Sequence, residues 1–436
     1  MKGIRLLARP TEEQKKVLSQ WMGCARQIWN AKCEDEFYMT RFARRYCPIG
    51  TYAPIDQSYS QYKSKELTPW LFDCPSQLLR NRVTNWYRTY QKFEKSKCGK
   101  PKRKKKSDTA SIYLTREVFS FKKDSQGHLK LFIGTKRNNI GYLSIKRHKK
   151  FTLPNSITIK REKGRYYVSF SYGEAQKDAI SFNKANLQYL RTSSPDWLAQ
   201  HTIGIDRGVT IPVQTNQRSF DLDAYQKRKK AGKERYLKRL QRQLSRQKKG
   251  SNRRTKTKHK IGRTHQTLAN IRNNFCHQVS HTLTSEKSTK VIVLEDLHTK
   301  GMTRSAKGTL SQPGKRVKAK SGLNRGILDK SWYRLEAYLS YKSQNRGKAL
   351  FKVSAHYTSQ ACADCDHTHP GNRPTQSDFV CQSCGHTDNA DRNAAKVIKK
   401  KAIKLILDTG TVLSERGVLT PGLESGRGAE SHALLT

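Results

Sequence analysis

Acidic residues are scarce in this sequence. Its 436 residues include 34 aspartates and glutamates against 87 lysines and arginines, which gives a formal net charge of +53. Solubility does not require so large a charge, and a field of this size attracts polyanions. Basic side chains that neutralise phosphates release counterions, so a nucleic acid is the expected partner.

Long apolar runs are missing as well. The sequence has no apolar run of about 18 residues, and the opening MKGIRLLARP lacks the core of a signal peptide. An anionic membrane surface is the rival partner for so basic a chain, but neither an amphipathic membrane helix nor a lipidation motif is present. We therefore expect no membrane partner and a cytoplasmic protein.

Only four of the ten cysteines have paired spacing. Cys362 and Cys365 form one Cys-x-x-Cys pair and Cys381 and Cys384 form another, with fifteen residues between the pairs. This spacing matches the four-thiolate zinc pattern. Four thiolates leave no open position for water, so the pattern predicts a structural Zn²⁺. The alternative is four reduced cysteines without a metal.

The remaining cysteines and the nearby histidines are weaker candidates. His367, His369 and His386 could compete as zinc ligands, but the complete thiolate set argues against it. A cytoplasmic setting keeps thiols reduced, so isolated cysteines indicate packing or surface thiols. These are Cys24, Cys33, Cys47, Cys74, Cys98 and Cys276.

Residue periodicity predicts a strand over residues 2–8 and then a helix. Thr11 and Gln14 have the spacing of a capping box at the start of that helix. Residues 116–134 and 156–173 are typical of β-hairpins, with alternating aromatics that indicate core rather than a base-stacking platform. The apolar face expected on the first helix comprises Leu18, Trp21, Met22, Ala25, Ile28 and Trp29.

The second half of the chain has a different pattern. A polar stretch at about 174–200 is the candidate domain boundary. VIVLEDL (291–297) is a nearly continuous apolar run, typical of a strand covered on both faces. We expect a long mobile loop over 300–326 and a helix over 331–346 that ends at Gly347. The tail after residue 408 has no aromatic residue, which predicts disorder.

Positive charge is concentrated in two segments. Residues 95–106 contain eight basic residues among twelve, and residues 227–263 contain 18 basic residues and one acid. Either segment could be solvated surface, but the charge of the whole chain favours contact with a phosphate backbone. The candidate contact residues are Lys102, Arg103, Lys104, Lys238, Arg239, Arg242, Arg253 and Arg254.

Three acids stand out against this basic background. Asp206 ends the stretch TIGI, Glu295 ends VIVL, and Asp391 heads a helical pattern after the second cysteine pair. Each has an ordinary alternative, namely a turn acid, an ion pair with an arginine, or a helix N-cap. Their order predicts instead that they converge on two Mg²⁺ or Mn²⁺ ions roughly 4 Å apart. Asp296 must point to the opposite strand face, so Glu295 is the expected ligand.

At these residues the sequence resembles the TnpB (OrfB-type) family encoded by bacterial insertion sequences, which is similar to type V CRISPR nucleases. The matching pieces occur in family order and span most of residues 4–398. There are two departures: Arg207 sits where the family usually has an apolar residue, and Asp366 follows the second cysteine where glycine is common. The pieces are RLLARPTEEQ…QIWN, GRYYVSFSY, GIDRGV, IRNNFCHQVSHTL, VIVLEDLHTKGM, SWYRLEAYLSYK, YTSQACADC and CQSCGHTDNADRNAA.

The resemblance implies a fold of the α/β plus β class. It consists of an RNase H-like RuvC nuclease domain with an inserted zinc ribbon, preceded by a β-barrel-like wedge domain with a helical recognition insert. The implied boundaries are 1–10 and 107–195 for the wedge, 11–106 for the insert, 196–355 for the nuclease domain with a basic helical segment at 221–287, 356–388 for the target-binding zinc ribbon, 389–408 for the last nuclease segment, and 409–436 for a disordered tail.

The resemblance also implies an activity. It is RNA-guided, Mg²⁺-dependent cleavage of DNA beside a short transposon-adjacent motif, with Asp206, Glu295 and Asp391 as the nuclease acids. The implied partners are a guide RNA from the element's right end and a double-stranded DNA target, and a monomer is favoured. DNA binding would associate the cytoplasmic protein with the nucleoid. The alternatives are an RNA-guided regulator that binds DNA without cutting it, and a transposition accessory protein.

Overall fold

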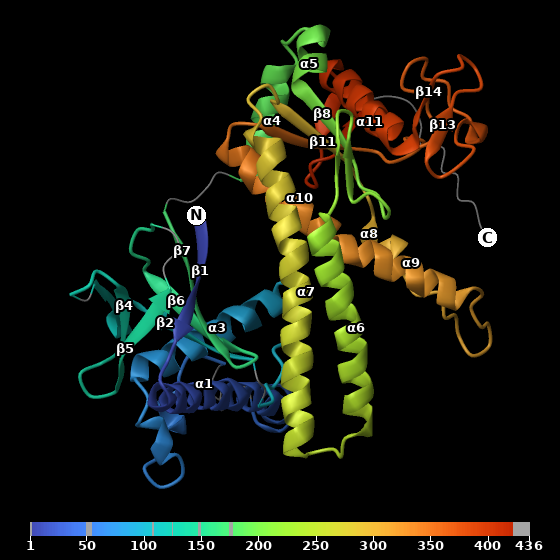
Figure 1. The fold of residues 1–436 in the computed structure, drawn as a ribbon. Coiled ribbons are helices and arrows are strands. Elements are labelled where there is room, and N and C mark those ends of the chain that lie inside the picture. Colours follow the sequence, from blue (N-terminus) through green and yellow to red (C-terminus); the bar gives the residue numbers. More distant parts are fainter. Residues whose placement is uncertain are drawn as a thin grey trace. The chain divides into compact units, whose positions relative to one another are not determined.

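The chain forms two compact units, Met1–Ala175 and Gln176–Thr436 (Figure 1). The structure is a computed structural model, and it describes residues 2–48, 55–106, 109–123, 125–146, 150–173 and 178–421. The boundary between the units falls within the polar stretch expected from the sequence. In the described ranges, no helix is both long enough and apolar enough to cross a membrane.

The first unit is built on a seven-stranded antiparallel sheet with the order β2-β6-β7-β1-β5-β4-β3. Both expected hairpins form, because β3 pairs with β4 and β6 pairs with β7. No ladder in the described part of the chain joins β2 to β3, so barrel-like closure is not confirmed. The strands are β1 (Lys2–Arg9), β2 (Ala110–Thr115), β3 (Phe119–Lys123), β4 (Leu129–Gly134), β5 (Asn139–Lys146), β6 (Ser156–Glu162) and β7 (Arg165–Tyr172).

Helix α1 (Glu12–Tyr38) begins with the predicted capping box. The Gln14 amide donates to Thr11 Oγ1 at 3.2 Å, and the Thr11 amide donates to Gln14 Oε1 at 3.1 Å. The predicted apolar face of α1 is buried throughout. The unit's other helical segments are a π-helical turn (Met39–Ala43), α2 (Arg44–Tyr46), α3 (Ser76–Glu94) and the 3-10 turns Ser60–Tyr62, Pro69–Leu71 and Arg116–Val118.

The helices of the first unit share one hydrophobic core with the sheet. Leu18 on α1 and Leu78 on α3 belong to the same buried cluster as Leu6 on β1 and Ile112 on β2. The expected helical insert therefore folds together with the strands rather than as a separate domain.

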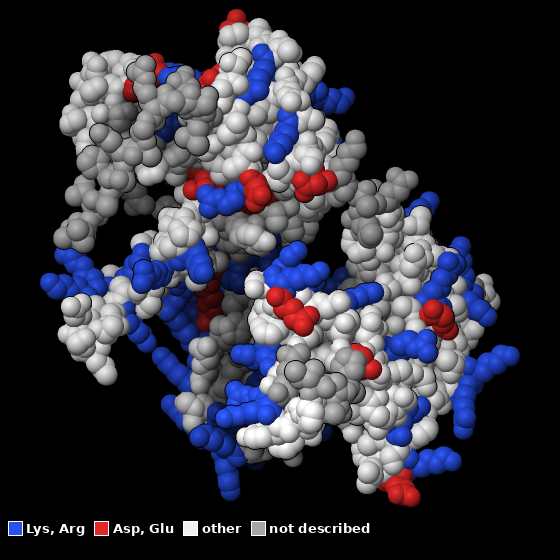
Figure 2. Space-filling model, turned by 180° about the vertical axis from the view of Figure 1, so that it is seen from behind, with Lys and Arg blue, Asp and Glu red and all other residues white. Residues whose placement is uncertain are grey.

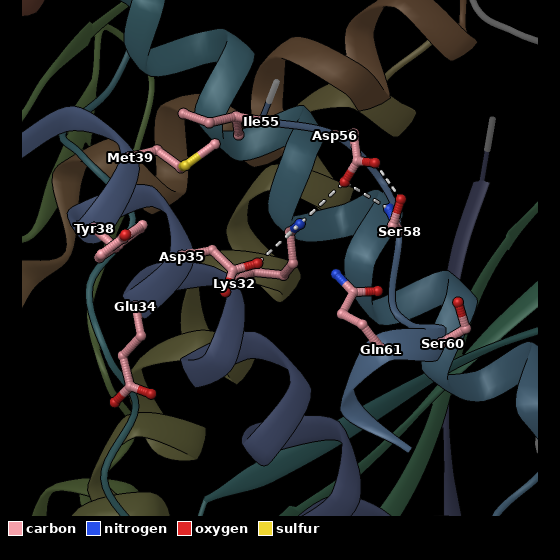
Figure 3. A pocket seen from close by; sticks show the side chains of 10 residues that line it. All are labelled: Lys32, Glu34, Asp35, Tyr38, Met39, Ile55, Asp56, Ser58, Ser60 and Gln61. Carbon is pink, nitrogen blue, oxygen red and sulfur yellow. Dashed lines mark hydrogen bonds and ion pairs between the residues drawn. The ribbon is translucent and has the colours of Figure 1, made fainter. Parts of the chain in front are cut away.

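A pocket of about 610 Å³ lies beside the C-terminal half of α1 (Figure 3). Lys32 is only 2 % exposed, and its Nζ lies 3.5 Å from Asp35 and 3.3 Å from Asp56. The pair with Asp35 lies within α1, whereas the pair with Asp56 ties α1 to the segment that follows residue 55. No sequence pattern indicated the pair with Asp56. The lining residues are Lys32, Glu34, Asp35, Tyr38, Met39, Ile55, Asp56, Ser58, Ser60 and Gln61.

The second unit contains a mixed five-stranded sheet with the order β10-β9-β8-β11-β12. β8, β11 and β12 are parallel, and β9 and β10 extend the sheet in antiparallel fashion. β11 is buried on both faces as predicted, with Val291 and Val293 in one core cluster and Ile292 and Leu294 in another. The strands are β8 (Thr202–Asp206), β9 (Val213–Thr215), β10 (Ser219–Phe220), β11 (Val291–Glu295) and β12 (Ala349–Val353).

Helices cover both faces of this sheet. One core cluster includes residues of α4, α5 and α11, and the other includes residues of α7 and α10. α6 and α7 lie side by side as a long helical hairpin (Figure 1). The helices are α4 (Ala179–Leu190), α5 (Pro195–His201), α6 (Ala224–Arg246), α7 (Asn252–Ser285), α8 (Thr299–Met302), α9 (Val317–Lys330), α10 (Trp332–Asn345) and α11 (Ala390–Leu407). Two short hairpin strands, β13 (Asp378–Val380) and β14 (Thr387–Asn389), precede α11.

The wedge boundary at residue 195 is wrong. Residues 179–190 form α4 of the second unit, because Leu187 and Leu190 are buried with Leu198 in its core. Asn183 is also buried there, and its side-chain amide donates to the Leu350 carbonyl at 3.0 Å.

Two segments expected to lack structure are ordered. Part of the expected loop at 300–326 forms α9, where Ile327 is buried and Asp329 pairs with Arg272 at 3.0 Å. The start of the expected disordered tail forms the hairpin β15 (Thr411–Leu413) and β16 (Leu419–Pro421), because Leu413 and Leu419 pack into the core. Residues 422–436 lie outside the described residues.

α11 approaches β8 very closely at Gly204. A Cβ atom at this position would lie 2.1 Å from the Ala395 carbonyl oxygen and 2.8 Å from the Lys399 nitrogen. Only glycine therefore lets the helix pack against the strand that ends at Asp206.

Gly204→Ala should destabilise the second unit by about 1–3 kcal/mol, because the new methyl group forces α11 away from β8. Urea denaturation measures the change. Gly3→Ala on β1 is the matched control, since nothing lies within 4 Å of its ideal Cβ. Equal stability of the two variants would contradict the close approach.

Candidate metal centres and nucleic-acid surfaces

The three predicted acids lie near one another at one edge of the second sheet. β8 and β11 are parallel and pair Ile205 with Leu294, which brings the next residues, Asp206 and Glu295, to neighbouring strand ends. Asp391 lies in the first turn of α11, which packs on β8. Asp206 interacts electrostatically with both of the other acids.

The other two carboxylates repel Asp206 in a partly buried setting. The pKa of Asp206 is raised to about 7, mainly by burial and to a smaller extent by repulsion from Glu295 and Asp391. Burial also raises the pKa of Glu295, although a hydrogen bond from the Thr358 hydroxyl and nearby cationic side chains oppose the rise. An electronegative cluster of carboxylate oxygens is the kind of site that hard divalent cations prefer.

Asp391 is not the N-cap of α11. Asn389 takes that position, and its Oδ1 accepts from the amides of Asp391 at 3.1 Å and Arg392 at 3.2 Å. The Asp391 carboxylate instead lies 3.2 Å from Nη2 of Arg373. The helix therefore does not need this carboxylate for capping.

The carboxylate of Glu295 is not paired with the neighbouring arginine. Arg207 donates to the backbone carbonyl oxygen of Glu295 and, at 3.2 Å, to Oε2 of Glu336. The Glu295 carboxylate accepts from the hydroxyl of Thr358, which is 3 % exposed. Asp296 pairs instead with a lysine of β12 at 3.3 Å, as expected for the opposite strand face.

The four predicted cysteines form one cluster. All four Sγ atoms lie within 4.8 Å of one another, with Cys362 and Cys384 at 3.7 Å and Cys365 and Cys381 at 3.6 Å. Four Zn–S bonds of about 2.3 Å give a tetrahedral edge of roughly 3.8 Å, whereas a disulfide needs about 2.05 Å. The cluster therefore fits a Zn²⁺ ion rather than two disulfides.

The nearby histidines do not join this cluster. His386 Nδ1 lies 2.8 Å from Oδ2 of Asp364, and His369 Nδ1 accepts from the Gly371 amide at 3.1 Å. Among the described residues, the group of ligand atoms around the cysteines contains the four cysteines and no histidine.

The cysteine cluster is tied directly to the helix of the third acid. Asn393 on α11 is fully buried, and its side chain accepts from the Ala363 amide at 3.0 Å and donates to the Ala361 carbonyl at 2.8 Å. Ala390 at the helix start also donates to the Ser377 carbonyl at 2.8 Å. The segment around the cysteines therefore helps to hold the beginning of α11.

Sequence reasoning missed three residues of this region: Thr358, Arg373 and Asn393. Each contacts a residue or element at a distance in the chain, and none belongs to a local motif. Arg373 lies between the two cysteine pairs, so its contact with Asp391 depends on how the segment between these pairs folds against the start of α11.

Basic side chains greatly outnumber acidic ones on the face seen in Figure 2. Of the first candidate segment, Lys102 accepts through its carbonyl from Trp29 Nε1 at 2.9 Å, and Lys104 Nζ lies 3.4 Å from the centroid of the Trp29 ring. Arg103 pairs with Glu34 at 2.9 Å between exposed side chains. The segment is therefore ordered against α1 and is not a free linker.

The candidates on α6 and α7 divide into two groups. Arg254 donates to the carbonyls of Leu244 and, at 2.9 Å, Gln247, so it serves the turn between the helices and is a poor candidate for phosphate contact. The exposed candidates are Lys238, Arg239, Arg242 and Arg253.

The fold and these sites define a class of α/β proteins with a carboxylate cluster at a sheet edge and a four-cysteine module beside it. Three family models match the chain: "Probable transposase" of the OrfB group at residues 186–306, "Cas12f1-like, TNB domain" at 332–398, and "Helix-turn-helix domain" at 1–32. Residues 2–32 fold as β1 and part of α1 rather than as a helix-turn-helix.

Two curated relatives are similar over nearly the whole chain. One, from Escherichia coli (strain K12), bears the name RNA-guided DNA endonuclease InsQ and is 32 % identical over 401 residues, which cover 91 % of each chain. Another, from Streptomyces pristinaespiralis, is also named an RNA-guided DNA endonuclease and is 26 % identical over 396 residues, covering 89 % of this chain and 86 % of that one. The chain belongs to the TnpB (OrfB-type) family.

A solved structure is similar in fold. It is Cas12f1 in complex with a guide RNA and target DNA, with a TM-score of 0.53 and 14 % identity over 89 % of this chain and 83 % of that chain. At this level of identity the likeness concerns the fold alone.

Cys384→Ser should reduce the zinc content from one ion per chain to a small fraction of that, because three thiolates bind Zn²⁺ far more weakly than four. Elemental analysis of the purified protein measures this. Hydrogen exchange should also speed up at the start of α11. Cys98→Ser changes an exposed thiol outside the cluster and should retain full zinc content. Full zinc content in both variants would refute the site.

Asp206→Asn should stabilise the metal-free protein at pH 8, on the order of 1–4 kcal/mol. The carboxyl has a pKa of about 7 in the folded chain against 3.8 ordinarily, so its ionisation opposes folding. The penalty builds up between about pH 4 and pH 7 and is largely absent below that window. Melting temperatures across this range should show the gap closing as the pH falls. Asp196→Asn, at an exposed position on α5, should show no such gap.

Proposed function

We propose that this chain is an RNA-guided DNA endonuclease that cuts DNA at a single RuvC-like, Mg²⁺-dependent site beside a short transposon-adjacent motif. The observation that carries the proposal is the meeting of Asp206, Glu295 and Asp391 at one sheet edge. Repulsion of Asp206 by the other two carboxylates is unfavourable in a partly buried place unless cations neutralise the charge. Membership in the family of the relatives above supports the guide and the DNA target.

The residues of the site would have separate tasks. Asp206, Glu295 and Asp391 would hold two Mg²⁺ or Mn²⁺ ions, and Thr358 would orient the Glu295 carboxylate through its hydroxyl. Arg373 would neutralise part of the charge of Asp391. When bound, the cations would supply Lewis acidity that activates a water and stabilises the leaving oxygen of the phosphodiester.

The cysteine module would be a structural zinc ribbon inserted into the nuclease domain. Its bond through Asn393 to α11 would keep Asp391 near the other two acids. The module would also face the target nucleic acid beside the cutting site.

The basic surface would grip nucleic-acid backbones. Guide–target pairing would carry sequence specificity, while the protein holds the duplex through its phosphates and reads the flanking motif. The exposed residues of α6 and α7 and the ordered segment 102–104 are the candidate contacts. The guide would come from the right end of the element, and the chain would act as a monomer, with the first unit supplying the wedge and recognition functions.

An RNA-guided regulator that binds DNA without cutting it is the alternative. The intact set of three acids favours cleavage, because a binding protein gains nothing from retaining repelling carboxylates. A transposition accessory protein would likewise not need them.

The purified chain should carry a discrete RNA and, with that RNA and Mg²⁺, cut DNA that matches the guide. Asp206→Ala should lower the cutting rate by at least about 10³-fold and leave DNA binding intact, because the acid is needed for cation binding and not for the backbone grip. Gel-based cleavage and binding assays on the same complex separate the two effects.

The matched control is Asp196→Ala, at an exposed acid of the same unit, which should cut at the wild-type rate. Absence of any discrete RNA would exclude a guided activity. Guided binding without cutting by the wild-type chain would favour the regulator.

A further inference from the structure

Arg207 is a buried arginine directly beside the acid cluster. It follows Asp206 at the end of β8 and is 4 % exposed. Its Nη1 donates to Oε2 of Glu336 at 3.2 Å, its Nη2 donates to the carbonyl oxygen of Glu295, and its Nε has no partner among the described residues. Burying a guanidinium without a full set of hydrogen-bond partners is unfavourable. Stabilisation of the fold is therefore not a sufficient reason for the Arg207–Glu336 ion pair.

The contacts of Arg207 fall where the pairing between β8 and β11 stops. The parallel register of these strands ends one residue before the two acids. On its other edge, β11 stays paired with β12 as far as Glu295. The Arg207 guanidinium therefore connects the ends of β8 and β11 at the level of Asp206 and Glu295, where the two strands no longer pair through their backbones.

Glu336, the carboxylate partner of Arg207, is itself held in place. Its Oε1 lies 3.1 Å from Lys352 Nζ, which also lies 3.3 Å from Asp296 Oδ1. Asp296 pairs in turn with Arg416, in the turn between β15 and β16. Alternating charges thus form a chain from Arg207 through Glu336, Lys352 and Asp296 to Arg416. This chain of ion pairs restricts the orientation of the Glu336 carboxylate toward Arg207.

We propose that Arg207 and Glu336 form a positioning pair that sets the separation of Asp206 and Glu295 for divalent-cation binding. The inference rests on the proposed function, because it assigns these acids to cations. Arg207 acts on Glu295 through the backbone carbonyl and not through the carboxylate, so its role is positioning. Removal of the pair should therefore weaken cation binding without removing a cation ligand.

The test uses the double variant Arg207→Met/Glu336→Met, which replaces both charges with apolar side chains of similar length. The probe is Mn²⁺ alone, titrated against the full-length, zinc-containing chain freed of RNA and followed by electron paramagnetic resonance. We expect at least tenfold weaker Mn²⁺ binding with a melting temperature equal to or above that of the wild type. In the guide complex, cutting should need at least tenfold more Mg²⁺ for half-maximal rate and should recover at saturating Mg²⁺.

The matched control is Arg218→Met/Glu286→Met, which removes another ion pair of the same unit, with side chains 44 % and 25 % exposed. It should bind Mn²⁺ as the wild type does. Glu336→Gln keeps the size of the side chain and should weaken Mn²⁺ binding at least threefold, and it decides the matter if the double variant fails to fold.

Wild-type Mn²⁺ affinity in the folded double variant, or in Glu336→Gln, would overturn the positioning role. A lower melting temperature with unchanged Mn²⁺ affinity would overturn it too, because that result describes a structural ion pair. A wild-type chain that binds no Mn²⁺ would instead overturn the proposed function, and the inference with it.

Discussion

The repulsion of Asp206 by Glu295 and Asp391 is the unfavourable interaction that the fold of the second unit must outweigh. Parallel pairing of β8 and β11 brings the first two acids to adjacent strand ends. Gly204 lets α11 pack against β8 and bring the third acid close. Without these constraints the like charges would separate into water, where each carboxylate is better solvated.

The cysteine cluster and the carboxylate cluster are linked through α11. Thiolates are soft ligands that suit Zn²⁺, whereas carboxylates are hard ligands that suit Mg²⁺ or Mn²⁺, so under the proposed function the two clusters would bind different cations. Asn393 joins the cysteine segment to the helix, and Asn389 caps the helix in place of Asp391. The Asp391 carboxylate is therefore not used for capping and has Arg373 as its ion-pair partner.

The remaining charge of the chain is arranged in two ways. Exposed lysines and arginines on α6 and α7 leave a basic surface, whereas Arg207, Arg254 and Lys352 are committed to interior carbonyls and carboxylates. Counting basic residues therefore overstates the surface that a nucleic acid can contact. Arg416 in the C-terminal hairpin is also committed to an ion pair, because it contacts Asp296 directly after β11.

Local features of the chain were determined by the sequence alone. The capping box at Thr11, the doubly buried strand β11 and the four-cysteine cluster were predictable, because backbone periodicity and ligand spacing act over a few residues. Only the tertiary structure decided that α4 belongs to the second unit, that residues 411–421 are ordered, and that Arg207, Thr358 and Arg373 contact the acid cluster. These outcomes depend on which buried faces and charges meet across long sequence separations, and no local pattern encodes that.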